Sequence, residues 1–177
     1  MIATSPAERP PASPFWNFSL RFYGQPGVPP ACIALQEKSG VDVNVLLFCL
    51  FAATSHRELI DEDVARIIAS IDDWKTNVVV PLRKARVYLR APAEALNTDA
   101  AAALRQRLKA LELEAERLQQ EALFETFPLA HLGRPGAAAS AAAGYNIETL
   151  ERVLRATFDR QAVAVVLSAF DKLGIDS

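Results

Sequence analysis

Apolar residues recur at steps of three and four along most of the chain, which is the spacing of one face of an α-helix. This pattern predicts helices over residues 15–23, 30–38, 43–54, 61–89 and 98–127, followed by one or two more over 145–173. We therefore expect an all-α protein, built as a single compact bundle of about six to seven helices.

The segment 43–54 (VNVLLFCLFAAT) is apolar on every side, unlike the other expected helices. A helix of this kind is stable only when other elements surround it, so we expect it at the centre of the bundle. Asp42 stands directly before it and can cap it by accepting hydrogen bonds from its first free N–H groups.

The longest apolar stripe runs from Val64 through Trp74 to Leu89 and predicts one long helix. Pro81 interrupts it, because proline lacks a backbone N–H and its ring clashes with the preceding turn. We expect a kink near residues 77–81 or a break into two helices. The β-branched run Val78–Val80 is also compatible with a strand, but the sequence offers no second strand to pair with it, so we favour the helix.

A heptad-like seam marks the expected helix over 98–127. Its members alternate steps of four and three: Ala101, Leu104, Leu108, Leu111, Ala115, Leu118 and Ala122. Such a seam is typical of a coiled-coil-like helix, and its partner is a helix of the same chain or of a second copy.

Composition shifts divide the chain into four segments. Residues 1–14 carry four prolines and no apolar core, which indicates a disordered leader. The helical bundle spans 15–127, the Ala/Gly/Pro-rich stretch 128–144 suits a mobile linker, and 145–177 is expected to be a helical segment that packs on the bundle. No membrane span is expected, since the longest apolar run, 45–53, has nine residues where about 20 are needed.

The charge balance and the cysteines argue against some classes of function and suggest a cellular location. Nineteen Lys and Arg residues oppose twenty-one Asp and Glu residues, so the net charge of −2 argues against nucleic-acid binding. Cys32 and Cys49 both lie in apolar stretches, which fits buried reduced thiols and a cytoplasmic protein.

One local cluster of cations stands out, because residues 74–93 hold five Lys and Arg residues and no carboxylate. Arg83, Arg86 and Arg90 share one helix face and could hold a phosphate or carboxylate. The plainer interpretation is a solvated face, or pairing with acidic side chains of a neighbouring helix, namely Glu112, Glu114, Glu116 and Glu121. Asp42 and Asn44 are the other candidate ligand-binding residues: capping explains Asp42, whereas Asn44 needs a partner on another helix or a ligand.

The usual catalytic motifs are missing from the sequence. It contains no Gly-x-Ser-x-Gly, no glycine-rich nucleotide loop, and no His or Cys pair at metal-ligand spacing. We therefore predict no catalytic residue, no metal and no cofactor. The sequence leaves open whether the protein is an enzyme, and it favours a non-catalytic protein.

The N-terminal half resembles a known family. The residues that carry the resemblance are Phe15-Trp16-x-Phe18-Ser19-Leu20, Pro26-Gly27-Val28, Ala31-Cys32, Leu35-Gln36 and Gly40-x-Asp42-Val43-Asn44-x-Leu46-Leu47-Phe48, with further matches from Trp74 to Arg86 and near 112–117. This pattern resembles a family of small proteobacterial proteins of unknown function over about 15–120. The resemblance implies a bacterial, cytoplasmic protein and assigns no activity.

These observations favour a non-catalytic protein-interaction or adaptor module. Its partner would be another protein, or a second copy bound through residues 101–122. The alternative is a small-molecule enzyme or carrier that binds an anionic ligand near Arg83, Arg86, Asp42 and Asn44.

Overall fold

The computed structural model describes residues 12–90 and 98–175 and confirms the all-α class. The α-helices are α1 (Pro14–Tyr23), α2 (Val28–Ser39), α3 (Val43–Ala53), α4 (Asp61–Trp74), α5 (Val80–Tyr88), α6 (Thr98–Thr126), α7 (Ala139–Leu154) and α8 (Arg160–Asp171). A π-helical turn, η1 (Lys75–Val79), joins α4 to α5, and η2 (Leu129–His131) is a short 3-10 helix. Two-residue strands β1 (Arg57–Glu58) and β2 (Arg134–Pro135) pair antiparallel.

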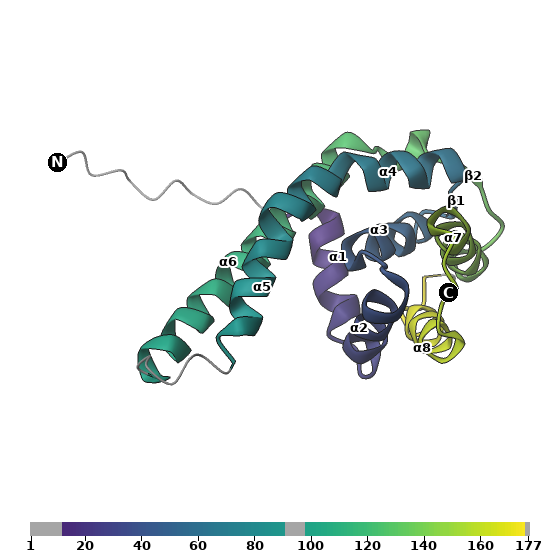
Figure 1. The fold of residues 1–177 in the computed structure, drawn as a ribbon. Coiled ribbons are helices and arrows are strands. Elements are labelled where there is room, and N and C mark those ends of the chain that lie inside the picture. The colour runs from purple at the N-terminus through teal and green to yellow at the C-terminus, as the bar shows by residue number, and fades with distance from the viewer. Residues whose placement is uncertain (1–11, 91–97, 176–177) are drawn as a thin grey trace.

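The helices form a body and an arm (Figure 1). In the body, α3 lies among α1, α2, α7 and α8, and α4 crosses above them. The arm is α5 together with the N-terminal half of α6, and it projects away from the body. The C-terminal half of α6 returns to the body and packs on α1, α3 and α4.

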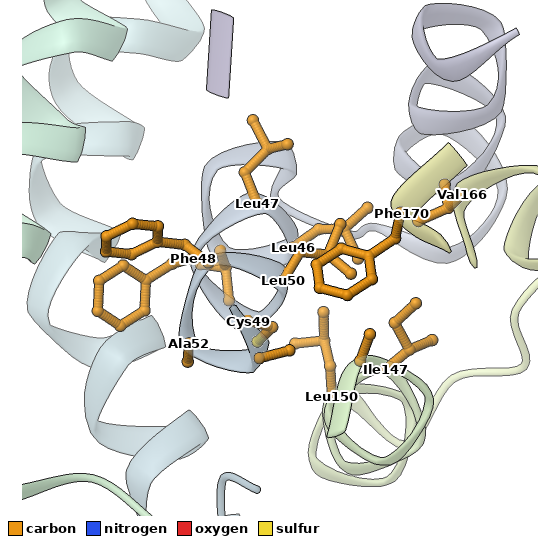
Figure 2. Close-up of a cluster of buried hydrophobic side chains, with 14 of the residues drawn as sticks. Leu46, Leu47, Phe48, Cys49, Leu50, Ala52, Ile147, Leu150, Val166 and Phe170 are labelled. Atoms are coloured by element: carbon orange, nitrogen blue, oxygen red, sulfur yellow. The ribbon is translucent and has the colours of Figure 1, made fainter. Parts of the chain in front are cut away.

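Helix α3 is central, as predicted. Every residue from Asn44 to Ala53 is buried, and Asp42 caps the helix by accepting hydrogen bonds from the backbone N–H groups of Asn44 (2.9 Å) and Val45 (3.3 Å). On one side, Leu46 and Leu50 face α7 and α8; on the other, Phe48 meets the rings of Phe15 and Phe127 (Figure 2). The body therefore has one core that includes helices from both ends of the chain.

The long helix continues through Pro81 without a break, because its backbone widens there. The N–H of Val80 bonds the carbonyl of Lys75, five residues back, so the turn before the proline is π-helical. This widening adjusts the backbone where Pro81 has no N–H to donate and its ring crowds the carbonyl four residues earlier. The helical interpretation of Val78–Val80 is confirmed, and the strand alternative is wrong.

The structure differs from the expected linker over 128–144 in its second half. Helix α7 begins at Ala139, and Ala139, Ala142 and Ala143 are fully buried. Small side chains leave little to bury individually, but they let two helices approach closely, and α7 packs here on α3. Most of the expected leader, 1–11, lies outside the described residues, whereas Ser13 caps α1 and Pro14 begins it.

A membrane span is not found among the described helices, because each is too short or too polar to cross a bilayer.

Candidate functional site

The predicted seam of α6 is divided between two faces of the helix. Ala101 and Ala115 are buried and Leu108 is half-buried, as a seam packed inside the chain would require. Leu104, Leu111 and Leu118, however, are 42%, 55% and 44% exposed. We call these three residues the leucine row. Helices of the same chain therefore cover only part of the predicted seam.

Polar residues take the place of the leucines on the buried face of α6. Glu112, Gln119 and Gln120 are each at most 5% exposed. The side-chain nitrogen of Gln120 donates to Oδ1 of Asn44 at 2.8 Å, and Glu112 binds arginines of α5. If the leucines faced inward instead, Asn44 of α3 and the arginines of α5 would lose these partners. A buried polar group without a hydrogen-bond partner destabilises the fold. A pattern of apolar positions alone cannot detect a helix that buries its polar side.

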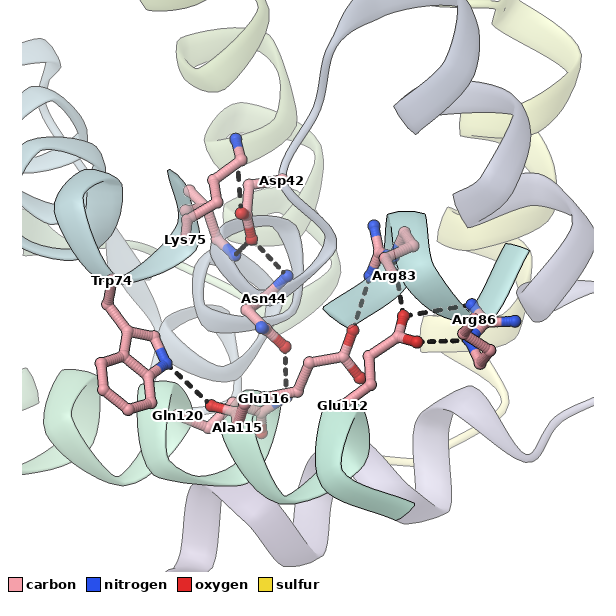
Figure 3. A network of polar contacts seen from close by, with 11 residues as sticks. Asp42, Asn44, Trp74, Lys75, Arg83, Arg86, Glu112, Ala115, Glu116 and Gln120 are labelled. Carbon is pink, nitrogen blue, oxygen red and sulfur yellow. Dashed lines mark hydrogen bonds and ion pairs between the residues drawn. The ribbon is translucent and has the colours of Figure 1, made fainter. Parts of the chain in front are cut away.

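Two arginines of α5 hold two glutamates of α6 (Figure 3). Arg83 donates from Nε to Glu112 Oε1 at 2.8 Å and from Nη2 to Glu116 Oε1 at 2.6 Å. Arg86 binds both oxygens of Glu112, through Nε and, at 3.1 Å, through Nη2. This is the pairing that the plainer interpretation of the cationic stretch anticipated for Glu112 and Glu116. It fastens the two helices of the arm to each other.

The two glutamates respond differently to this environment. Burial acts to raise the pKa of Glu112, but the hydrogen bonds from Arg86 and Arg83 outweigh it, and the pKa lies below its ordinary value. For Glu116, burial dominates over the attraction of Arg83, and the pKa is raised. Glu112 is therefore the firmly ionised anchor of the network.

Asp42 and Asn44 belong to the junction where the arm meets the body (Figure 3). Besides capping α3, Asp42 lies 3.5 Å from the ammonium of Lys75 in the π-helical turn. Asn44 has the partner on another helix that its position demanded, Gln120 of α6. The two side chains thus connect the start of α3 to the π-helical turn and to α6.

A cleft of about 680 Å³ lies between α2 and the arm. It is lined by Arg83 and Arg86 of α5, Arg90 in the turn after α5, Lys109, Glu112 and Glu116 of α6, and residues of α1 and α2. The structure therefore brings the three arginines of the predicted site together, whereas Asp42 and Asn44 are not among the lining residues. Arg90 and Lys109 form no ion pair with any side chain in 12–90 or 98–175.

Trp74 is a feature that sequence analysis placed wrongly. It was expected within the buried stripe of the long helix, yet it is 38% exposed, and its indole Nε1 donates to the carbonyl of Ala115 at 3.1 Å. It therefore lies against α6 one turn from both Leu111 and Leu118. The amphipathic spacing of the long helix indicated that Trp74 is buried, but its ring packs beside α6 and stays partly exposed to solvent.

Among the described residues, no three His, Cys, Asp or Glu side chains are grouped so that they could hold a metal ion.

The chain matches a known protein family. The family described as "Protein of unknown function (DUF2390)" matches residues 14–123, well over half of the chain. The chain belongs to the DUF2390 family. No curated protein and no solved structure matches it.

The DUF2390 match confirms the resemblance found over about 15–120. It begins at the first residue of α1 and ends within the last turn of α6. The DUF2390 region therefore contains α3, the junction, the arm and the leucine row of α6, while α7 and α8 lie beyond it.

Proposed function

We propose that this DUF2390 protein is a non-catalytic interaction module that binds another protein through the leucine row of α6. The observation that carries the proposal is the exposure of Leu104, Leu111 and Leu118 at a spacing of seven residues on α6, whose N-terminal half projects from the body. Large apolar side chains aligned on one helix face are typical of helix-mediated protein binding.

The arm is suited to this role because it is fixed in advance. The Arg83–Glu112–Arg86 contacts tie α5 to α6, and Gln120 and Trp74 tie α6 to α3 and to the end of α4. A surface that is already ordered loses less conformational entropy on binding. The polar residues on the buried face of α6 therefore support the display of the apolar row on its outer face.

Catalysis and anion binding have less support. Burial raises the pKa of both Cys32 and Cys49 to about 12, so neither is a thiolate nucleophile at neutral pH. Glu112 and Glu116 already bind the guanidinium groups of Arg83 and Arg86, so an anionic ligand would have to compete with two carboxylates of the same chain.

A photo-crosslinking amino acid introduced in place of Leu111 tests the proposal in cells that express the protein. We expect a covalent protein adduct from position 111, because the residue is more than half exposed and lies in the middle of the row. The matched control is the same amino acid in place of Ala65, which is exposed on α4 of the body. Absence of an adduct at position 111, or equal adducts at both positions, would contradict the proposed function.

A further inference from the structure

We propose that the occupant of the leucine row is a second copy of this chain, bound with the two α6 helices antiparallel and Leu111 at the twofold axis. This inference rests on the proposed function and names its partner. It is carried by the positions of the charged residues beside the row, which are self-complementary in this arrangement alone.

The row itself is symmetric about Leu111, since Leu104 and Leu118 each lie seven residues away. In an antiparallel pair centred on Leu111, Leu104 meets Leu118 of the second copy, and Leu111 meets its own counterpart. At 1.5 Å per residue the contact extends about 21 Å along the helix. Every exposed leucine of the row then gains an apolar neighbour.

Arg107 and Glu114 flank the row on the same side, each three residues after a leucine. They stand four residues before and three residues after Leu111, so antiparallel pairing brings Arg107 within one residue, about 1.5 Å along the helix, of the level of Glu114 of the second copy. Symmetry repeats this contact, which gives two ion pairs of opposite charge. Glu114 also binds Arg117 at 2.9 Å in its own chain, but a carboxylate accepts several hydrogen bonds and can serve both arginines.

A parallel pair does not fit the same surface. It would set the Arg107 flank against the opposite flank of the second helix, where Glu112 and Gln119 lie. Those residues are buried within their own chain, at 5% and 2% exposure, and cannot face a second copy. The antiparallel pair also places the two bodies at opposite ends of the joined arms, because each body lies at one end of its arm (Figure 1).

Charge reversal in the purified full-length protein tests this geometry. We expect sedimentation equilibrium to show a dimer for the wild type. Arg107→Glu alone and Glu114→Arg alone each weaken it at least about tenfold, because both ion pairs become repulsive. The double variant R107E/E114R restores dimer affinity to within about threefold of the wild type, since the charges are again opposite. Lys84→Glu, an exposed charge reversal on α5, is the control and leaves the affinity unchanged.

Circular dichroism of each variant verifies that the helices are intact, which is expected because Arg107 is exposed and Glu114 is partly exposed. A wild-type protein that is monomeric at about 1 mM, or a double variant as weak as the single ones, would overturn the antiparallel dimer. If the photo-crosslinker at position 111 captures a different protein, the second copy is refuted and the interaction module stands. If it captures nothing, both fall.

Discussion

Replacing Asn146 by alanine is expected to lower the free energy of unfolding by about 3–5 kcal/mol, the largest effect of any single polar substitution considered for this chain. Asn146 of α7 is fully buried. Its Oδ1 accepts from the backbone N–H of Leu59 at 2.7 Å, and its Nδ2 donates to the carbonyls of Cys49 and Arg57, both at 2.9 Å. Alanine would leave these backbone groups unpaired inside the core and a cavity beside them.

Urea denaturation followed by circular dichroism measures this loss. Asn17→Ala is the matched control, because Asn17 is exposed and makes only a 3.4 Å contact with the carbonyl of Ala12; its effect should stay within about 0.5 kcal/mol. If Asn146→Ala is as mild as the control, then α7 is not joined to α3 and β1 in the way described.

Replacing Glu112 by alanine is expected to destabilise the protein by about 2–3 kcal/mol at neutral pH. Arg86 loses the partner of both its donating nitrogens, and Arg83 keeps only Glu116. The pKa of Glu112 is lowered in the folded state, so its contribution is fully present above the ordinary glutamate pKa of 4.5 and is lost as the pH falls through the folded-state pKa. The difference between variant and wild type should therefore shrink below about pH 4.

Urea titrations of both proteins at several pH values measure this difference. The raised pKa of Glu116 has the opposite sign, with stability lost as the pH rises. Removing Glu112 takes away one cause of that raised pKa, but burial, its largest cause, is present in both proteins. Glu125→Ala, at an exposed position near the end of α6, should be neutral at every pH. A Glu112→Ala difference that does not depend on pH would refute the ionised anchor.

The central position of α3 can be predicted from the sequence because it depends on residues that are neighbours in the chain. The all-round apolar pattern of 43–54 predicts a central helix, and Asp42 at its start predicts the cap that the structure contains. The family resemblance over about 15–120 needed only short motifs. In each case neighbouring residues determine the result.

The orientation of α6 was harder to predict because it is determined by polar pairs that are distant in the sequence. Glu112 and Arg83 are separated by 29 residues, and Gln120 and Asn44 by 76. No local spacing in the sequence therefore predicts that these polar groups are buried together. Their pairing turns α6 and brings its leucines to the surface. The start of α7 at Ala139 also depends on a distant contact. The alanines at the start of α7 are stabilised by close packing against α3, which the local sequence does not reveal.

The central claim is that the leucine row is covered by another polypeptide in the cell. The most direct test is the rate at which a permeable thiol reagent labels a Leu111→Cys variant, measured in intact cells and again after lysis and dilution. The native thiols interfere little, because Cys32 and Cys49 are buried and have pKa values of about 12. We predict slow labelling at position 111 in cells and at least about tenfold faster labelling after dilution, while Ala65→Cys reacts equally in both. Equal rates for Leu111→Cys in cells and after dilution would contradict the account.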